Sequence, residues 1–256
     1  MKKLFTLLVA LLVGPSAYAY NLTKDFSDGF YWSSLPVSFL VMDTDSARLQ
    51  LISEIAQDAV SEWEGVMVDN LWSVSSRQGS PVSNTNIIRW STNFAKETGL
   101  DATKTLAVAI RYSRGPYIAR AEIVLNGGHF TNSDPDNLKS VLVHELGHIL
   151  GLDHSDTWGA VMYATFQTYR GLHWDDVSGM TYTLNETKRR QAIGYVSPLS
   201  TSESSEGSAL SCGTVDMSSG GGSGPGGSSQ NPILSLGIGL LLALAALRPG
   251  FKTRRG

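Results

Sequence analysis

The stretch "SVLVHELGHILGLDHSDTWGAVMYATF", residues 140–166, decides how this sequence folds. Three of the five histidines of the chain fall within eleven residues of it, in a segment that is otherwise apolar enough to be buried. His144 and His148 are four residues apart, so on a helix they lie on the same face, one turn from each other. Upstream, Asp134-Pro135 supplies a helix cap and a proline for the first helical position, which predicts that the helix opens there.

The histidine spacing indicates a metal site. Two imidazole nitrogens on one helical face can reach a single zinc ion at about 2.0–2.1 Å. Gly151 allows a left-handed backbone that ends the helix and turns the chain, so that His154 can return as a third ligand. Three nitrogen ligands leave the fourth position open for water, which is the arrangement of a catalytic zinc. Glu145, offset around the helix, can reach that water without binding the metal.

A cluster of this kind can also be a set of hydrogen-bonded core histidines, or a site for zinc that only holds the fold together. The complete pattern, with Glu145 beside the first histidine and only three nitrogen ligands, disfavours both.

The pattern His-Glu-x-x-His-x-x-Gly-x-x-His, with Met162 eight residues after the third histidine, resembles the metzincin zinc peptidases. Within that clan the chain is similar to the matrixins, whose third histidine is followed by serine, as Ser155 follows His154 here. The resemblance covers about residues 35–184. One departure is Ala164, which stands where matrixins commonly have a proline two residues after the methionine, so the wall of the specificity pocket differs.

The resemblance implies a cofactor and an activity. It assigns catalytic zinc to His144, His148 and His154, and it makes Glu145 the general base and then the general acid in the hydrolysis of a protein or peptide substrate. Residues 121–130, "AEIVLNGGHF", resemble the family's substrate-pairing edge strand. Residues 164–169 are expected to wall the pocket beyond the scissile bond and to favour an apolar side chain.

Two further expectations follow from the same resemblance. Structural calcium is common in matrixins, and Asp134 and Asp136 offer candidate oxygen ligands, although no recognisable calcium loop appears. The alternative to an enzyme is a zinc-binding, non-catalytic peptide-binding module of the cell envelope, which would carry the same residues.

The remaining pattern predicts an α+β layered fold with one mixed, twisted sheet. Residues 44–66 carry apolar side chains at helical spacing after a cap at Asp45 or Ser46, which predicts a long packing helix. The active-site helix completes the helical part that the pattern predicts, and the resemblance to the matrixins implies a further, C-terminal helix over about residues 173–185. Residues 117–126 alternate and end at Asn-Gly-Gly, which predicts an edge strand closed by a turn. The expected strands are 35–43, 86–92, 105–113 and 117–126.

The pattern of the N-terminal end predicts a targeting segment. Two lysines, a short apolar run and Ala17-Tyr18-Ala19 predict a secretory signal peptide over residues 1–19, with cleavage before Tyr20. The apolar run is too short for a first transmembrane helix and ends at Gly14-Pro15. Residues 20–185 are therefore expected to form the catalytic domain.

The C-terminal end reads as a sorting or anchor tail. Residues 186–232 are rich in serine and glycine and predict a linker with little fixed structure. Residues 233–256 comprise a mostly apolar segment, marginal for a membrane span of about 20 residues, and a basic tip that favours the cytoplasmic side. This layout resembles the Gly-Gly-type sorting tails of Gram-negative bacteria. We therefore expect an exported protein, secreted or held in the cell envelope, with membrane contact through a tail that a protease can remove.

Charge and cysteine content restrict the partners. The two ends hold six of the 20 basic residues and none of the 23 acidic ones, which leaves the part between them with a net charge of −9. Nucleic acid is therefore not an expected partner. Cys212 is the only cysteine, so an internal disulfide is excluded, and a free thiol, intermolecular pairing and modification all stay open. A monomer is expected.

Overall fold

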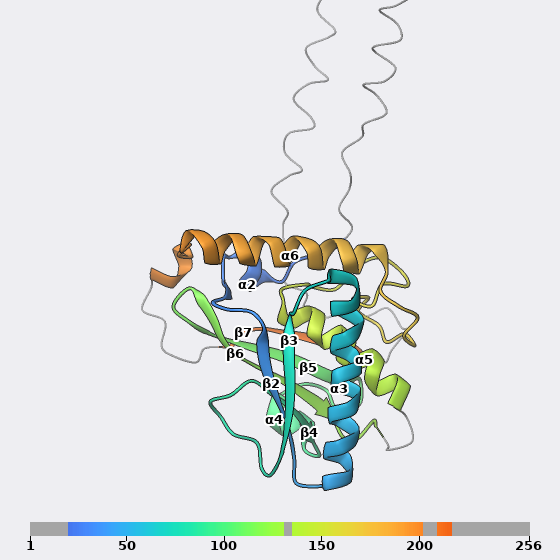
Figure 1. Cartoon of the computed structure of the whole chain (residues 1–256). Helices are drawn as coiled ribbons and strands as arrows, with labels where there is room; N and C mark the ends of the chain where they lie inside the picture. Colours follow the sequence, from blue (N-terminus) through green and yellow to red (C-terminus); the bar gives the residue numbers. More distant parts are fainter. Residues whose placement is uncertain (1–19, 131–134, 202–208, 217–256) are drawn as a thin grey trace, which may run out of the picture. The chain divides into compact units, whose positions relative to one another are not determined.

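A computed structural model of the protein describes residues 20–130, 135–201 and 209–216 (Figure 1). The expected signal peptide, the C-terminal tail and Asp134 lie outside these residues. The strands are β1 (Tyr31–Trp32), β2 (Val37–Asp43), β3 (Trp72–Gln78), β4 (Ile87–Ser91), β5 (Thr105–Arg114), β6 (Tyr117–Asn126) and β7 (Ala209–Asp216). The helices are α2 (Lys24–Ser27), α3 (Ser46–Met67), α4 (Phe94–Thr98), α5 (Pro135–Ile149), α6 (Trp174–Ile193) and the 3-10 helix η1 (Pro198–Thr201).

One mixed sheet organises the domain, as predicted. Its strand order is β3-β2-β4-β6-β5-β7, and β1 pairs with β6. The pairs among β3, β2, β4 and β6 are parallel, whereas β5 runs antiparallel to both of its neighbours. Parallel strands need both faces covered, and most apolar residues of β2 and β4 are accordingly buried.

The sheet differs from the sequence prediction in one strand position and in one additional strand. Residues 117–126 do not form an edge strand, because β6 lies between β4 and β5 and its C-terminal half is buried. The alternation that suggested an edge is confined to the first residues of β6, next to the hairpin from β5. Strand β3 was not anticipated, since its serine-rich sequence is largely exposed and carries little apolar signal.

Helices α3 and α5 supply much of the hydrophobic core and lie on the same face of the sheet (Figure 1). Helix α3 begins after Asp45, whose side chain accepts a hydrogen bond from the backbone N–H of Arg48, as the sequence predicted. Its buried face ends at Trp63, whose indole N–H donates to the backbone oxygen of Val143 on α5 at 2.9 Å. This bond fixes the helix that carries the metal motif against the long packing helix.

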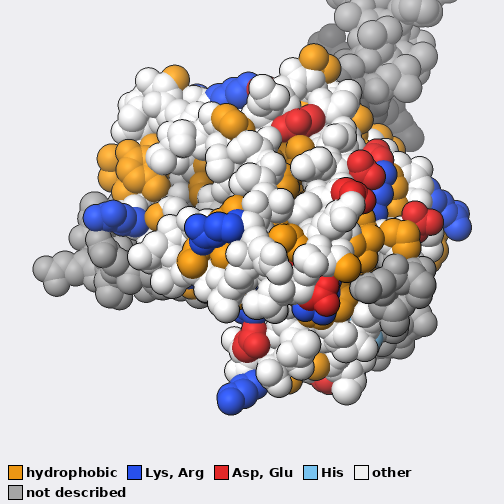
Figure 2. Space-filling view, turned by 60° about the horizontal axis from the view of Figure 1, so that its bottom comes forward, with side chains coloured by type: hydrophobic (Ala, Val, Ile, Leu, Met, Phe, Trp, Pro, Cys, Tyr) orange, Lys and Arg blue, Asp and Glu red, His pale blue; other side chains and the backbone are white. Residues whose placement is uncertain are grey.

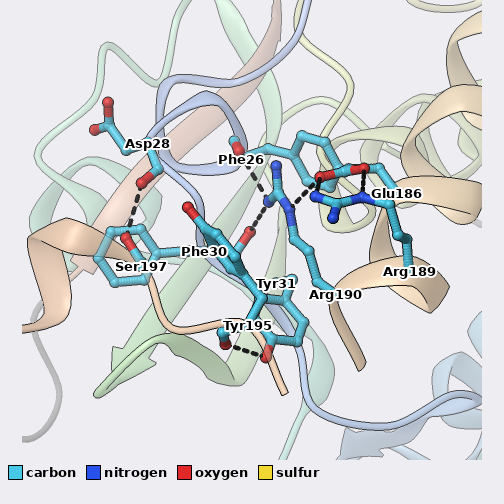
Figure 3. A network of polar contacts seen from close by, with 9 residues as sticks. All are labelled: Phe26, Asp28, Phe30, Tyr31, Glu186, Arg189, Arg190, Tyr195 and Ser197. Carbon is cyan, nitrogen blue, oxygen red and sulfur yellow. Dashed lines mark hydrogen bonds and ion pairs between the residues drawn. The ribbon is translucent and has the colours of Figure 1, made fainter. Parts of the chain in front are cut away.

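The C-terminal part contains more regular structure than the sequence indicated. Helix α6 continues to Ile193, and η1 and β7 both fall within the expected linker of residues 186–232. Figure 3 shows how the end of α6 binds the N-terminal segment: the Arg190 guanidinium donates to the backbone oxygens of Phe26 and Phe30 at 3.1 and 3.0 Å. Tyr31 and Ser197 add hydrogen bonds to the backbone of Tyr195 and Asp28.

The surface charge and the length and polarity of the helices are relevant to binding of nucleic acid and of membranes. On the face shown in Figure 2, basic and acidic side chains are interspersed, without a broad basic patch. Within the described part of the chain, every helix is too short or too polar to cross a bilayer.

A buried ion pair connects the N-terminal segment to β5. The Arg111 side chain is fully buried and donates to Asp25 at 2.7 and 3.0 Å. Burial alone would raise the pKa of Asp25, but the Arg111 charge and hydrogen bonds from Thr23 and Arg111 hold it below its usual value.

Removing this counter-charge tests the importance of the ion pair. We expect Asp25→Asn to lower the free energy of unfolding by about 3–5 kcal/mol, because it removes the carboxylate charge that compensates the buried Arg111 guanidinium. Urea unfolding of the full chain measures the loss. Asp28→Asn is the matched control, since Asp28 pairs with the exposed Lys24 and should cost less than about 1 kcal/mol. Equal losses in the two variants would contradict the assigned role of Asp25.

Candidate metal centre

The structure brings the three histidines of the motif together. One nitrogen from each of His144, His148 and His154 lies within 4.8 Å of the others. His144 and His148 come from successive turns of α5, and His154 follows the turn at Gly151, where φ is 102°. His144 and His148 are buried, while His154 is half-buried. The glycine-directed return of the third histidine, predicted from the sequence, is therefore present.

Hydrogen bonds fix which nitrogen each buried ring presents. The Nδ1 atoms of His144 and His148 each lie 2.7 Å from a backbone oxygen, of Val161 and Leu152 respectively. A carbonyl oxygen only accepts, so both Nδ1 atoms donate, and in a neutral ring the Nε2 atom then carries a lone pair.

The two Nε2 atoms face each other at 3.0 Å. Two facing lone pairs repel at this distance, and a cation shared between them removes the repulsion. Two nitrogens bound at 2.0–2.1 Å to one tetrahedral ion lie roughly 3.3 Å apart. The donor set and its spacing therefore fit zinc.

Burial keeps these rings neutral and ready to bind a metal ion. Desolvation and, to a smaller extent, His154 lower the pKa of His144 to about 3, against the opposing effect of the hydrogen bond to the Val161 oxygen. Desolvation, followed by the neighbouring His144 and His154, likewise lowers the pKa of His148 well below its ordinary value. At neutral pH, metal binding to these two residues does not have to displace a proton.

The chain turns at Met162, and this methionine turn packs against the helix that carries His144 and His148. Met162 is buried, and a Cβ atom placed on Gly147 would lie only 2.3 Å from its Sδ atom. The carboxylate of Asp176, at the start of α6, accepts hydrogen bonds from the backbone N–H groups of Val161 and Met162 at 2.8 and 3.0 Å. Helix α6 thus holds the turn whose Val161 oxygen orients His144.

The loop that carries His154 is held from two sides. Ser155 donates to Asp175 at 2.5 Å, and its backbone N–H donates to the oxygen of Met162 at 2.8 Å. From the other side, Asn21 donates to the backbone oxygen of His154 at 2.8 Å and accepts from the N–H of Asp153 at 2.9 Å. Sequence reasoning missed the role of Asn21, because nothing in the local pattern connects it with a loop about 130 residues away.

Glu145 lies beside the first ligand and is fully buried. Neither carboxylate oxygen has a hydrogen-bond partner of normal geometry among the described residues. Desolvation raises the pKa of Glu145 well above its ordinary value, and the nearby Ala109 backbone and Arg111 charge offset this only in part. A buried carboxyl group with a raised pKa next to a metal site is suited to accept and release a proton.

A cavity of about 250 Å³ adjoins the metal centre. Val161 lines it and also hydrogen-bonds to His144, so the cavity and the first ligand are neighbours. Phe166 and Tyr169, expected to wall the specificity pocket, line this cavity, whereas Ala164 is not among its lining residues. The Tyr169 hydroxyl donates to Glu62 of α3 at 2.7 Å, which fixes one wall.

Within residues 20–130, 135–201 and 209–216, the histidine trio is the one group of three or more potential ligands close enough to hold a metal ion. The candidate calcium ligand Asp136 is exposed at the start of α5, and its expected partner Asp134 lies outside the described residues.

The sequence model of peptidase family M10, the matrixins, matches residues 32–184. The chain belongs to the matrixin family. A plant protein, metalloendoproteinase 2-MMP of Arabidopsis thaliana, is 47% identical over 49 residues, which are 18% of this chain and 13% of the plant protein. The family is zinc-dependent, and this matrixin has the histidine trio in position.

The raised pKa of Glu145 leads to a pH-dependent stability of the zinc-free matrixin. A carboxyl group whose folded-state pKa is raised contributes stability below its unfolded pKa of about 4.5, and that stability is lost as the pH rises. We expect Glu145→Gln to stabilise the zinc-free protein, with a gain that grows by about 1.4 kcal/mol per pH unit above pH 4.5 until the folded-state pKa is reached. Urea unfolding of variant and parent between pH 4.5 and 7.5 measures the difference; a gain independent of pH would contradict this account.

Substitution of Gly151 tests whether the Phe26 ring restricts the turn that leads to His154. A Cβ atom there would lie 2.6 Å from the Phe26 ring, on a backbone that disfavours side chains. Gly99→Ala is the matched control, since Gly99 also has a positive φ but has nothing within 4 Å of the added atom. We expect roughly 1–2 kcal/mol of destabilisation from the backbone alone in Gly99→Ala, and about 1–3 kcal/mol more in Gly151→Ala. Chemical unfolding checks both values, and similar losses would show that Phe26 does not restrict position 151.

Proposed function

We propose that this matrixin is an exported zinc endopeptidase. The observation that carries the proposal is the pair of facing Nε2 atoms of His144 and His148, completed by His154 and flanked by the buried carboxyl group of Glu145. Among the described residues, three potential nitrogen ligands come together, and three protein ligands are typical of catalytic zinc, whereas structural zinc has four.

Each residue of the centre has a defined role in peptide hydrolysis. The three histidines hold the zinc ion, which, when bound, supplies a Lewis acid that activates water and polarises a carbonyl group. Glu145 accepts a proton on its carboxylate from the attacking water and passes it to the nitrogen of the leaving amine. The hydrogen bonds from His144 to Val161 and from His148 to Leu152 keep both rings in the tautomer that binds metal.

The adjoining cavity supports a preference for an apolar side chain next to the scissile bond. Phe166 and Val161 form the apolar part of its lining, beside polar residues such as Gln167, and the Tyr169 hydroxyl is already bound to Glu62. Protein or peptide substrates follow from the family. The sequence of residues 1–19 supports export. The sequence of residues 233–256 supports a temporary membrane tether. We propose a monomeric enzyme.

Substitution of the proposed general base tests the function. We expect Glu145→Gln to retain one zinc per chain and to lower kcat/KM on unfolded casein by about 10²–10⁴-fold, since it removes proton transfer and leaves the ligands intact. Metal analysis and a fluorogenic casein assay measure the two quantities. Glu97→Gln, which changes a carboxylate on α4 paired with Arg89, is the matched control and should leave activity unchanged.

The same assay separates the enzyme from a zinc-binding module that only binds peptides. A chelator should abolish hydrolysis by the parent protein, and added zinc should restore it. Full activity of Glu145→Gln would disprove the assigned role, and zinc-loaded parent protein without any hydrolysis would favour the binding module.

A further inference from the structure

The sheet edge next to the metal centre is covered by the chain's own C-terminal segment. Strand β7 pairs antiparallel with β5, from Thr105 opposite Asp216 to Tyr112 opposite Ala209, with a register shift near each end. The other side of β5 pairs with β6. Without β7, the N–H and C=O groups along one side of β5 would form an open edge that can pair with another strand.

Strand β5 is also the strand beside the proposed general base. Helix α5 packs against β5, and the backbone of Ala109 lies close enough to Glu145 to influence its carboxyl group. The register places Gly213 of β7 opposite Ala109 and Ser211 opposite Arg111. Helix α5 contacts β7 as well as β5. The C-terminal segment therefore runs past the metal centre rather than along a distant part of the sheet.

An extended peptide substrate needs this same edge. Peptides commonly bind to a sheet by adding a strand, because the backbone groups of the edge strand then supply the hydrogen bonds. The opposite edge, β3, is separated from β5 by β2, β4 and β6. At about 4.8 Å between neighbouring strands, strand β3 lies roughly 19 Å away from β5. Of the two outer strands that the sheet has without β7, β3 and β5, only β5 lies beside Glu145.

We propose that residues 209–216 act as an intramolecular substrate-like strand, which keeps the metal centre latent by occupying the edge of β5. This inference rests on the proposed peptidase function and adds its regulation. A segment of the same chain is present at an effective concentration of the order of millimolar, so a substrate has to displace it. Displacement of β7, or removal of the segment that carries it, opens the site.

Proline substitutions in β7 test the proposal in the full, zinc-loaded chain. Successive N–H groups of a strand point to opposite sides, so replacing the adjacent Gly213 and Thr214 by proline removes at least one bond to β5. We expect the double variant G213P/T214P to lower the KM for casein by the order of tenfold with little change in kcat, because the competing strand is weakened. Faster hydrogen exchange of the β5 amides between Ala107 and Arg111 should accompany the change.

A control variant and a synthetic peptide show whether any change in KM comes from β7 itself. S204P/S205P places two prolines in the same C-terminal region outside β7 and should leave KM and exchange unchanged. A synthetic peptide of residues 209–216 should inhibit G213P/T214P competitively. Unchanged KM in G213P/T214P despite faster exchange would overturn the proposal, as would unchanged exchange. Loss of cooperative unfolding in this variant would make β7 an integral strand and would also overturn it.

A binding measurement separates this proposal from the peptidase function. In the Glu145→Gln background, anisotropy of fluorescein-labelled casein reports binding without turnover. Tighter binding after G213P/T214P supports occupation of the edge by β7 even if G213P/T214P with Glu145 intact hydrolyses nothing, in which case the proposed function alone fails. Equal binding with and without the prolines overturns the latent strand, whatever the activity of the parent.

Discussion

The Nε2 atoms of His144 and His148 lie 3.0 Å apart inside the protein with their lone pairs facing each other, which constrains the whole metal centre. Backbone oxygens of Val161 and Leu152 hold both rings in this tautomer, and burial keeps them unprotonated. In the absence of a cation the arrangement is unfavourable, because burial disfavours a charged ring with a proton shared between the two Nε2 atoms, and the rings cannot move apart without losing a buried hydrogen bond. The helix, the turn at Gly151 and the methionine turn are all arranged around a positive ion.

The groups that hold this arrangement come from opposite ends of the domain. Asp176 of α6 binds the methionine turn, and Asn21 of the N-terminal segment binds the loop of His154. The N-terminal segment is in turn held by the buried pair of Asp25 with Arg111 and by Arg190 (Figure 3). Since these contacts converge on one loop, folding of the whole domain and formation of the metal centre are coupled. The edge strand β7 joins the same assembly through β5 and links access of substrate to the position of the C-terminal segment.

The sequence predicted the features that depend on local periodicity. The motif helix, the long helix after Asp45, the return at Gly151 and the histidine trio were all evident, because spacing along a helix determines which side chains share a face. Features that depend on partners distant in the chain were missed or misassigned. The alternation of residues 117–126 suggested an edge, yet strand order, which no local pattern encodes, places β6 inside the sheet. Strand β7 gave little signal within a Ser/Gly-rich region, and the bond between Asn21 and the loop of His154 gave none.

The central claim is that three histidine nitrogens hold a zinc ion whose remaining position is open to solvent. X-ray absorption at the zinc edge of the purified full chain tests it most directly. The account predicts one zinc per chain with three imidazole nitrogens at about 2.0–2.1 Å and a single light-atom ligand from solvent, and no sulfur in the first coordination sphere. A site that takes up no zinc after metal restoration, or one closed by a fourth protein ligand such as a thiolate at about 2.3 Å, would contradict it.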